Sequence, residues 1–168
     1  MKTVILIFLT MTLIMGCSSN DDSPSNAFNL DNQIHLSFKN QNGQNLLDNS
    51  VEGSYDIENM KLFYLIDNEP VEVTIENGFE LGSLALSYNN NKILQVFTNP
   101  SSSKVVEETT EYKVVENIAF LQLTQSETDT IKVYSKAGQG YFNVSKVWYN
   151  DNLVWTSQSD GTIEIIKP

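Results

Sequence analysis

Apolar and polar residues alternate along much of the chain, and no segment keeps a helical period convincingly for more than two turns. In QIHLSFK (33–39), Ile34, Leu36 and Phe38 point to one side, and the residues between them point to the other. Successive side chains of a β-strand point to opposite faces of its sheet, so this pattern is typical of a half-buried strand. MKLFYLI (60–66) is apolar on both faces and predicts a central strand.

Similar short segments follow along the whole chain, separated by turn signals such as DNEP (67–70) and the asparagine run at 89–91. About nine or ten short strands with regular turns predict an all-β fold, an antiparallel β-sandwich of immunoglobulin-like character. A closed β-barrel is the alternative. The further predicted strands are VEVTI (71–75), LALSY (84–88), KILQVFT (92–98), EYKVV (111–115), IAFLQLT (118–124), TIKVYSK (130–136), SKVWYN (145–150), LVWT (153–156) and TIEII (162–166).

The hairpin over 145–156 is the strongest local signal, because both of its strands alternate and a polar turn joins them. If Asp151-Asn152 is a two-residue turn, Trp148 lies opposite Trp155 on one face of the hairpin. A three-residue turn opposes Trp148 to Val154 instead.

The first residues have the pattern of a lipoprotein signal peptide. Lys2 is positive, and the mainly apolar run 4–15 is too short to span a membrane, which needs roughly 20 residues. The stretch Ile14-Met15-Gly16-Cys17 resembles the lipobox of bacterial lipoproteins. The resemblance implies that residues 1–16 are removed and that Cys17, the only cysteine, is acylated and becomes the first residue of the mature chain.

The segment after the cysteine is small, polar and acidic, so we expect residues 17–27 to form a lipidated, disordered tether. Asp21 and Asp22 resemble the acidic export signal of many Bacteroidota surface lipoproteins, and a solvated spacer is the alternative. Residues 28–168 are then predicted to form one β-sandwich domain, large enough to bury a core without disulfides. These features predict a cell-envelope protein, lipid-anchored at the outer membrane and facing the cell surface.

Three stretches together resemble a family of small Bacteroidota surface lipoproteins: FKNQNGQNLLD (38–48), KLFYL (61–65) and VSKVWYNDNLVW (144–155). That family pairs an early F-x-x-x-x-G-x-x-L-L element with a late K-V/I-W-Y/F-N hairpin that ends in V-W. The similarity spans most of the chain after the signal peptide. Its motifs are turn glycines, core leucines and a tryptophan hairpin, so it implies a lipoprotein and a β-sandwich without implying an activity.

The charge balance excludes one class of partner. The chain has 21 acidic residues against 10 lysines and no arginine, for a net charge of −11. Nucleic-acid binding depends on clustered cations that neutralise phosphates, so we exclude it. Anionic lipid headgroups should repel the chain as well, so the lipid anchor is the expected membrane contact.

The sequence contains no recognisable catalytic constellation, and we predict neither enzymatic activity nor a cofactor. His35 is the only histidine, and no nucleophile-elbow motif occurs. Zinc sites built from several His or Cys ligands are excluded by count. The acidic residues match no calcium loop. Pairs such as Glu127 and Asp129 are expected to be solvated turn and edge charges.

Two surface features remain as candidates. Asp129-Thr130-Ile131 resembles the D-S/T-aliphatic sequon for O-glycosylation in Bacteroidota, with Thr130 at a turn that would expose it, and an ordinary strand-start threonine is the alternative.

The rings of Trp148, Trp155 and Tyr149 are the other candidate, because they could stack on a sugar. The alternative is that one or both tryptophans are core anchors. In that case Trp148 is the stronger candidate for the core anchor, because Val147 and Tyr149 beside it leave the strand apolar on both faces.

Together these observations predict a non-catalytic interaction module whose partner is a glycan or a cell-envelope protein. A carbohydrate-binding module of a glycan-utilisation system is the first alternative. A hydrolase with an unrecognised carboxylate pair is the second.

Overall fold

The computed structural model describes residues 29–74, 86–99, 103–159 and 161–168. The predicted signal peptide, Cys17 and the tether lie outside the described residues. Within them, the chain forms twelve strands and one short 3-10 helix, η1 (Ile57–Asn59). The strands are β1 (Asn29–Asp31), β2 (Gln33–Lys39), β3 (Lys61–Ile66), β4 (Glu69–Glu72), β5 (Leu86–Tyr88), β6 (Leu94–Phe97), β7 (Lys104–Glu108), β8 (Tyr112–Thr124), β9 (Glu127–Gly138), β10 (Tyr141–Tyr149), β11 (Asn152–Thr156) and β12 (Ile163–Ile166).

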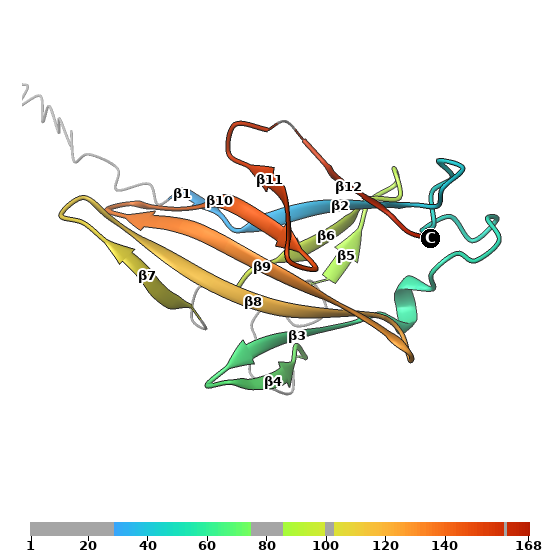
Figure 1. The fold of residues 1–168 in the computed structure, drawn as a ribbon, viewed down its shortest axis with the longest axis horizontal. Coiled ribbons are helices and arrows are strands. Elements are labelled where there is room, and N and C mark those ends of the chain that lie inside the picture. The colour runs from blue at the N-terminus through green and yellow to red at the C-terminus, as the bar shows by residue number, and fades with distance from the viewer. Residues whose placement is uncertain (1–28, 75–85, 100–102, 160) are drawn as a thin grey trace, which may run out of the picture.

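The strands form two sheets that pack together as a β-sandwich (Figure 1). The larger sheet has the order β1-β10-β9-β8-β3-β4, with β11 beside β10 and β7 beside β8, and the smaller sheet has the order β12-β2-β6-β5. In the described part of the chain neither sheet closes on itself, so the sandwich is confirmed and the closed barrel is wrong.

Both sheets are mixed, where the sequence predicts antiparallel pairing throughout. β1 runs parallel to β10, and β12 runs parallel to β2. These two strands join the sheets at their edges, far along the chain from the strands that they pair with. Tight hairpins impose antiparallel pairing on neighbouring strands, and no such hairpin constrains β1 or β12.

Three long strands, β8, β9 and β10, form the centre of the larger sheet. The sequence predicts a break between 111–115 and 118–124, but β8 is continuous through Asn117. This side chain is buried, and its Nδ2 donates a hydrogen bond to the backbone oxygen of Asn99 at 2.7 Å. The amide nitrogen of this polar residue therefore has a partner inside the strand, while its Oδ1 is buried without one among the described residues.

The core lies between the two sheets and follows the alternation of the strands. In β2, for example, Ile34, Leu36 and Phe38 are buried and the residues between them are half-buried. Aliphatic and aromatic side chains of both sheets form one cluster, which includes Leu62, Tyr64, Leu94, Val96, Leu121, Leu123, Ile131, Val133, Val147, Tyr149, Ile163 and Ile165.

A β-bulge in β10 decides which residues face this core. The register of β10 against β9 shifts between Val144 and Lys146, so Ser145 is the inserted residue. Without the shift, alternation would turn Val144, Lys146 and Trp148 to the same side. With it, Val144, Val147 and Tyr149 are buried, while Lys146 and Trp148 lie on the outer face of the larger sheet.

The β10–β11 hairpin differs from both predicted registers. Its two-residue turn is Asn150-Asp151, with φ values of 46° and 65°, the geometry of a tight hairpin turn. Trp148 therefore pairs with Leu153, and after a second irregularity Trp155 pairs with Val147. Trp155 packs against the core, and Trp148 does not belong to the core cluster. The prediction that Trp148 is the core anchor was wrong. The bulge at Ser145 changes the alternation of β10, so Trp148 faces outward while Val147 and Tyr149 face the core.

The two tryptophans should contribute unequally to stability. Trp155→Ala should lower the free energy of unfolding by about 3 kcal/mol, the lower end for deletion of a large core aromatic, because Trp155 is partly buried against the core. Trp148→Ala should cost about 1 kcal/mol, since it removes contacts on one face only. Urea denaturation measures both values. A loss for Trp148→Ala as large as that for Trp155→Ala would contradict this assignment.

Candidate functional site

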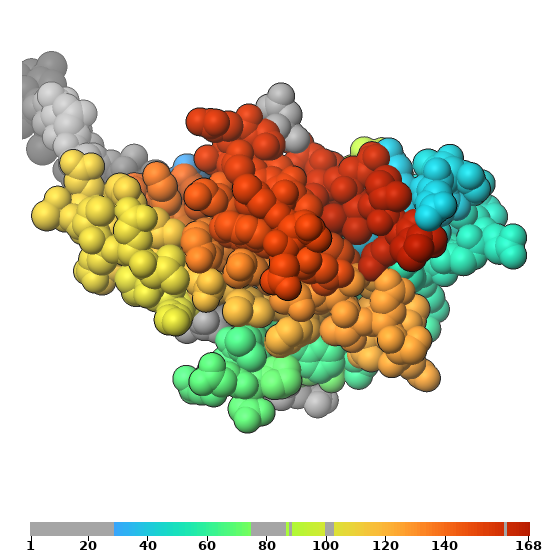
Figure 2. All heavy atoms as spheres, in the orientation of Figure 1, coloured from blue at the N-terminus to red at the C-terminus, as the bar shows by residue number. Residues whose placement is uncertain are grey.

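The outer face of the larger sheet carries an open groove of about 580 Å³. Five strands contribute to it. β8, β9 and β10 form its floor, and β7 and the end of β11 stand at its sides. In Figure 2 the yellow atoms of β7 and the orange-red atoms of β11 lie on the same side of the molecule, with orange atoms of β9 between them. We call it the Tyr134 groove, and its lining residues are Val106, Glu107, Tyr112, Val114, Tyr134, Lys136, Ser145, Lys146, Thr156, Ser157 and Gln158.

Tyr134 is central to this surface, with aromatic rings and lysines around it. Its ring centroid lies 4.7 Å from that of Trp148, at an interplanar angle of 60°. Lys146 is its cross-strand neighbour on β10. Lys132 and Lys136 lie two residues before and after Tyr134 on β9. The Nζ of Lys132 lies 4.8 Å from the ring centroid of Trp148. The Nζ of Lys136 lies 4.7 Å from the ring centroid of Tyr112. Rings and cations thus alternate across one sheet face.

Two tyrosine hydroxyls of this surface donate hydrogen bonds to carboxylates. The hydroxyl of Tyr112 donates a hydrogen bond to Glu107 at 3.2 Å, and this bond raises the pKa of Tyr112. Burial raises the pKa of Tyr134, and a hydrogen bond to Glu116 raises it further. Both phenols therefore stay protonated at neutral pH, and each carboxylate has a local donor.

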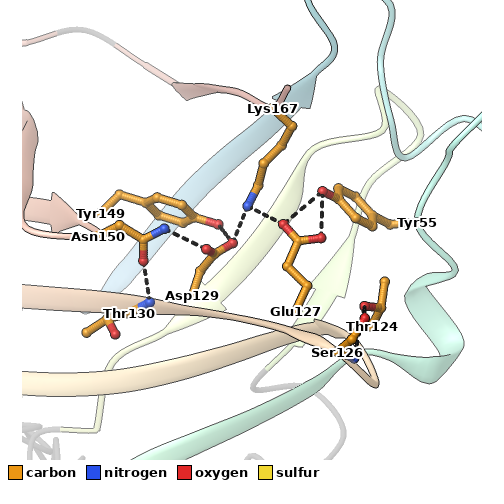
Figure 3. A network of polar contacts seen from close by, with 9 residues as sticks. All are labelled: Tyr55, Thr124, Ser126, Glu127, Asp129, Thr130, Tyr149, Asn150 and Lys167. Carbon is orange, nitrogen blue, oxygen red and sulfur yellow. Dashed lines mark hydrogen bonds and ion pairs between the residues drawn. The ribbon is translucent and has the colours of Figure 1, made fainter.

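A second polar cluster lies at the end of the sandwich where β8 turns into β9 (Figure 3). The Nζ of Lys167, just after β12, forms ion pairs with Asp129 and with Glu127, the latter at 2.7 Å. Asp129 also accepts hydrogen bonds from the hydroxyl of Tyr149 at 2.5 Å and from the Nδ2 of Asn150 at 2.6 Å. These contacts join the C-terminal segment of one sheet to β9 and β10 of the other.

The electrostatics of this cluster indicate a structural role. Burial alone would raise the pKa of Asp129, but hydrogen bonds from Lys167, Tyr149 and Asn150 outweigh it and lower the pKa below 3.8. A glycosidase needs a carboxyl group with a raised pKa as its general acid. Asp129 is the reverse case, so the pair with Glu127 does not support hydrolysis. The prediction that Asp129 is a solvated charge was wrong, because Asp129 is only 4% exposed.

The structure does not bring the predicted stacking rings together. Tyr149 is buried in the core, where its ring packs edge-on against Phe38 at 6.2 Å, and Trp155 also packs inward. Only Trp148 faces the groove side of the sheet. The sequence reasoning missed Tyr112 and Tyr134, although both alternate with core residues on their strands.

Thr130 lies inside β9 and not at a turn. Its N–H donates to the side-chain oxygen of Asn150 at 2.8 Å, and its carbonyl accepts from the N–H of Asn150 at 2.9 Å. It is half-buried and pairs with Phe120 of β8. The expectation that a turn exposes Thr130 was wrong, because β9 begins three residues earlier than the alternation suggests.

The remaining chemistry of the described residues is sparse. Their His, Cys, Asp and Glu side chains form no group of three that could hold a metal ion. The Nε2 of His35 is buried without a hydrogen-bond partner, and nothing there resembles a catalytic triad. None of the helical structure in the described ranges is long and apolar enough to cross a membrane.

In comparisons with protein-family models, curated proteins and solved structures, nothing matched the chain. The function must therefore be inferred from motifs and geometry, and the Tyr134 groove is the candidate binding site.

The Lys167 cluster makes a testable prediction about stability and pH. Lys167→Met should lower the free energy of unfolding by about 3–5 kcal/mol at pH 7, because it leaves Asp129 buried and charged without its cation. In the wild type, the contribution of Asp129 is fully present above its ordinary pKa of 3.8 and is lost as the pH falls through its lowered pKa. In the variant, burial raises the pKa of Asp129, so the difference between the two proteins should shrink between about pH 7 and pH 4.

Lys39→Met is the matched control for denaturation at both pH values. Lys39 of β2 forms an exposed ion pair with Glu164 of the neighbouring strand β12, and its loss should cost less than about 1 kcal/mol. Equal losses for the two variants would show that the Lys167 cluster has no special structural role.

Proposed function

We propose that this protein is a lipid-anchored, non-catalytic binding module, displayed at the outer membrane and facing the cell surface. The lipobox-like stretch 14–17 and the acidic segment after Cys17 support the anchor and the address. The resemblance to small Bacteroidota surface lipoproteins agrees with both. The lipid holds the chain at a membrane that its net charge of −11 would not favour.

One observation carries the binding role, and it is the Tyr134 groove. Its rings, lysines and hydroxyls lie on the face of the larger sheet that points away from the core. Half-buried aromatic rings beside polar groups are typical of binding surfaces. The other charged cluster, at Lys167, joins the two sheets and has its charges paired internally. We therefore place recognition at the groove and assign no catalysis.

The anchor is tested by metabolic labelling with a fatty-acid analogue. We expect the wild-type chain to be labelled and to sediment with the membranes, because several acyl chains on Cys17 bind a bilayer stably. Cys17→Ala should be unlabelled and soluble. Protease added to intact cells should digest the wild-type protein if it faces the surface. Equal labelling of both chains would refute the anchor, and protection from protease would refute surface display.

A further inference from the structure

We propose that the Tyr134 groove binds a carboxylate-bearing polysaccharide, a chain of acidic sugars. This inference rests on the proposed binding role and names the ligand class of the same site. It follows from three lysines without carboxylate partners, placed around aromatic rings on one sheet face.

The pairing of the lysines is the first argument. Four lysines of the described residues have carboxylate partners, and these are Lys39, Lys61, Lys113 and Lys167. Within that same part of the chain, the other five lysines form no ion pair. Lys92 and Lys104 lie elsewhere, whereas Lys132, Lys136 and Lys146 lie on the adjacent strands β9 and β10. In a chain with twice as many acidic as basic residues, these three unpaired cations outnumber the two carboxylates that the same face carries, Glu107 and Glu116. They favour an anionic ligand.

The spacing of these cations favours a ligand with several anions. Lys132 and Lys136 are four residues apart on β9, so their Cα atoms are separated by about 13 Å at 3.3 Å per residue. Lys146 lies on β10 opposite Tyr134, midway between them. A single small anion cannot reach all three positions, whereas a polymer with a carboxylate on each unit can lie along them.

The remaining groups of the groove favour sugar over other polyanions. Sugar rings present C–H groups that pack on aromatic rings, and Tyr112 and Tyr134 offer such rings in the groove. Sugar hydroxyls need hydrogen-bond partners, which Thr156, Ser157 and Gln158 can supply. Glu107 and Glu116 on the same face repel the dense charge of closely spaced phosphates more strongly than carboxylates that are spaced one to a sugar ring.

Titration calorimetry with the Cys17→Ala chain tests this assignment using three probes of equal length. The probes are an oligogalacturonate, its fully methyl-esterified form and an oligoglutamate. We expect the oligogalacturonate to bind and the ester to bind at least about tenfold more weakly, because esterification removes the charge but keeps the sugar. The oligoglutamate keeps the charge without the sugar, and it should also bind about tenfold more weakly. Raising the salt to about 0.5 M should weaken oligogalacturonate binding.

Lys136→Gln/Lys146→Gln should weaken oligogalacturonate binding about tenfold. The control is Lys113→Gln, a change of an exposed lysine on β8 that lies outside the groove lining. This control should bind like the parent. Equal binding of the ester or of the oligoglutamate would overturn the acidic-glycan assignment, as would an unaffected double variant. Absence of binding by all three probes would also overturn it, and the labelling of Cys17 would still test the anchor independently.

Discussion

The alternation of side chains along β8, β9 and β10 is the constraint on which the rest of the structure depends. Each of these strands gives every second residue to the core and the others to the outer face. The same strands therefore build the sandwich and present the Tyr134 groove. The bulge at Ser145 keeps this division intact, because it returns Val147 and Tyr149 to the core and leaves Lys146 and Trp148 outside.

The Lys167 cluster fastens the second sheet to this framework. β12 pairs with β2 in the smaller sheet, and Lys167 follows it directly. Its ion pair with Asp129 reaches β9 of the larger sheet. The hydroxyl of Tyr149 then connects Asp129 to β10. Burying a charge pair costs free energy, and the pair is tolerated here because both carboxylate oxygens of Asp129 accept hydrogen bonds.

Local patterns predicted the fold class and many of the strands. QIHLSFK became β2 with the expected bounds, because its alternation is regular. β7 was missed, since its five residues are all exposed and carry no alternation. The register of the tryptophan hairpin was predicted wrongly, because a bulge changes the phase of a strand without leaving a clear signal in the sequence. The groove depends on that register and on pairing between distant strands, so no local pattern could predict it.

The separation of folding and binding between the two faces of one sheet can be tested with the two tryptophans. An NMR spectrum of the Cys17→Ala chain should contain two indole N–H signals, one from each face. On titration with the oligogalacturonate, the signal of Trp148 should shift together with the backbone amides of Tyr134 and Lys146, while that of Trp155 stays in place. A shift of Trp155 without a shift of Trp148, or shifts confined to the residues around Lys167, would contradict the assignment of binding to the outer face.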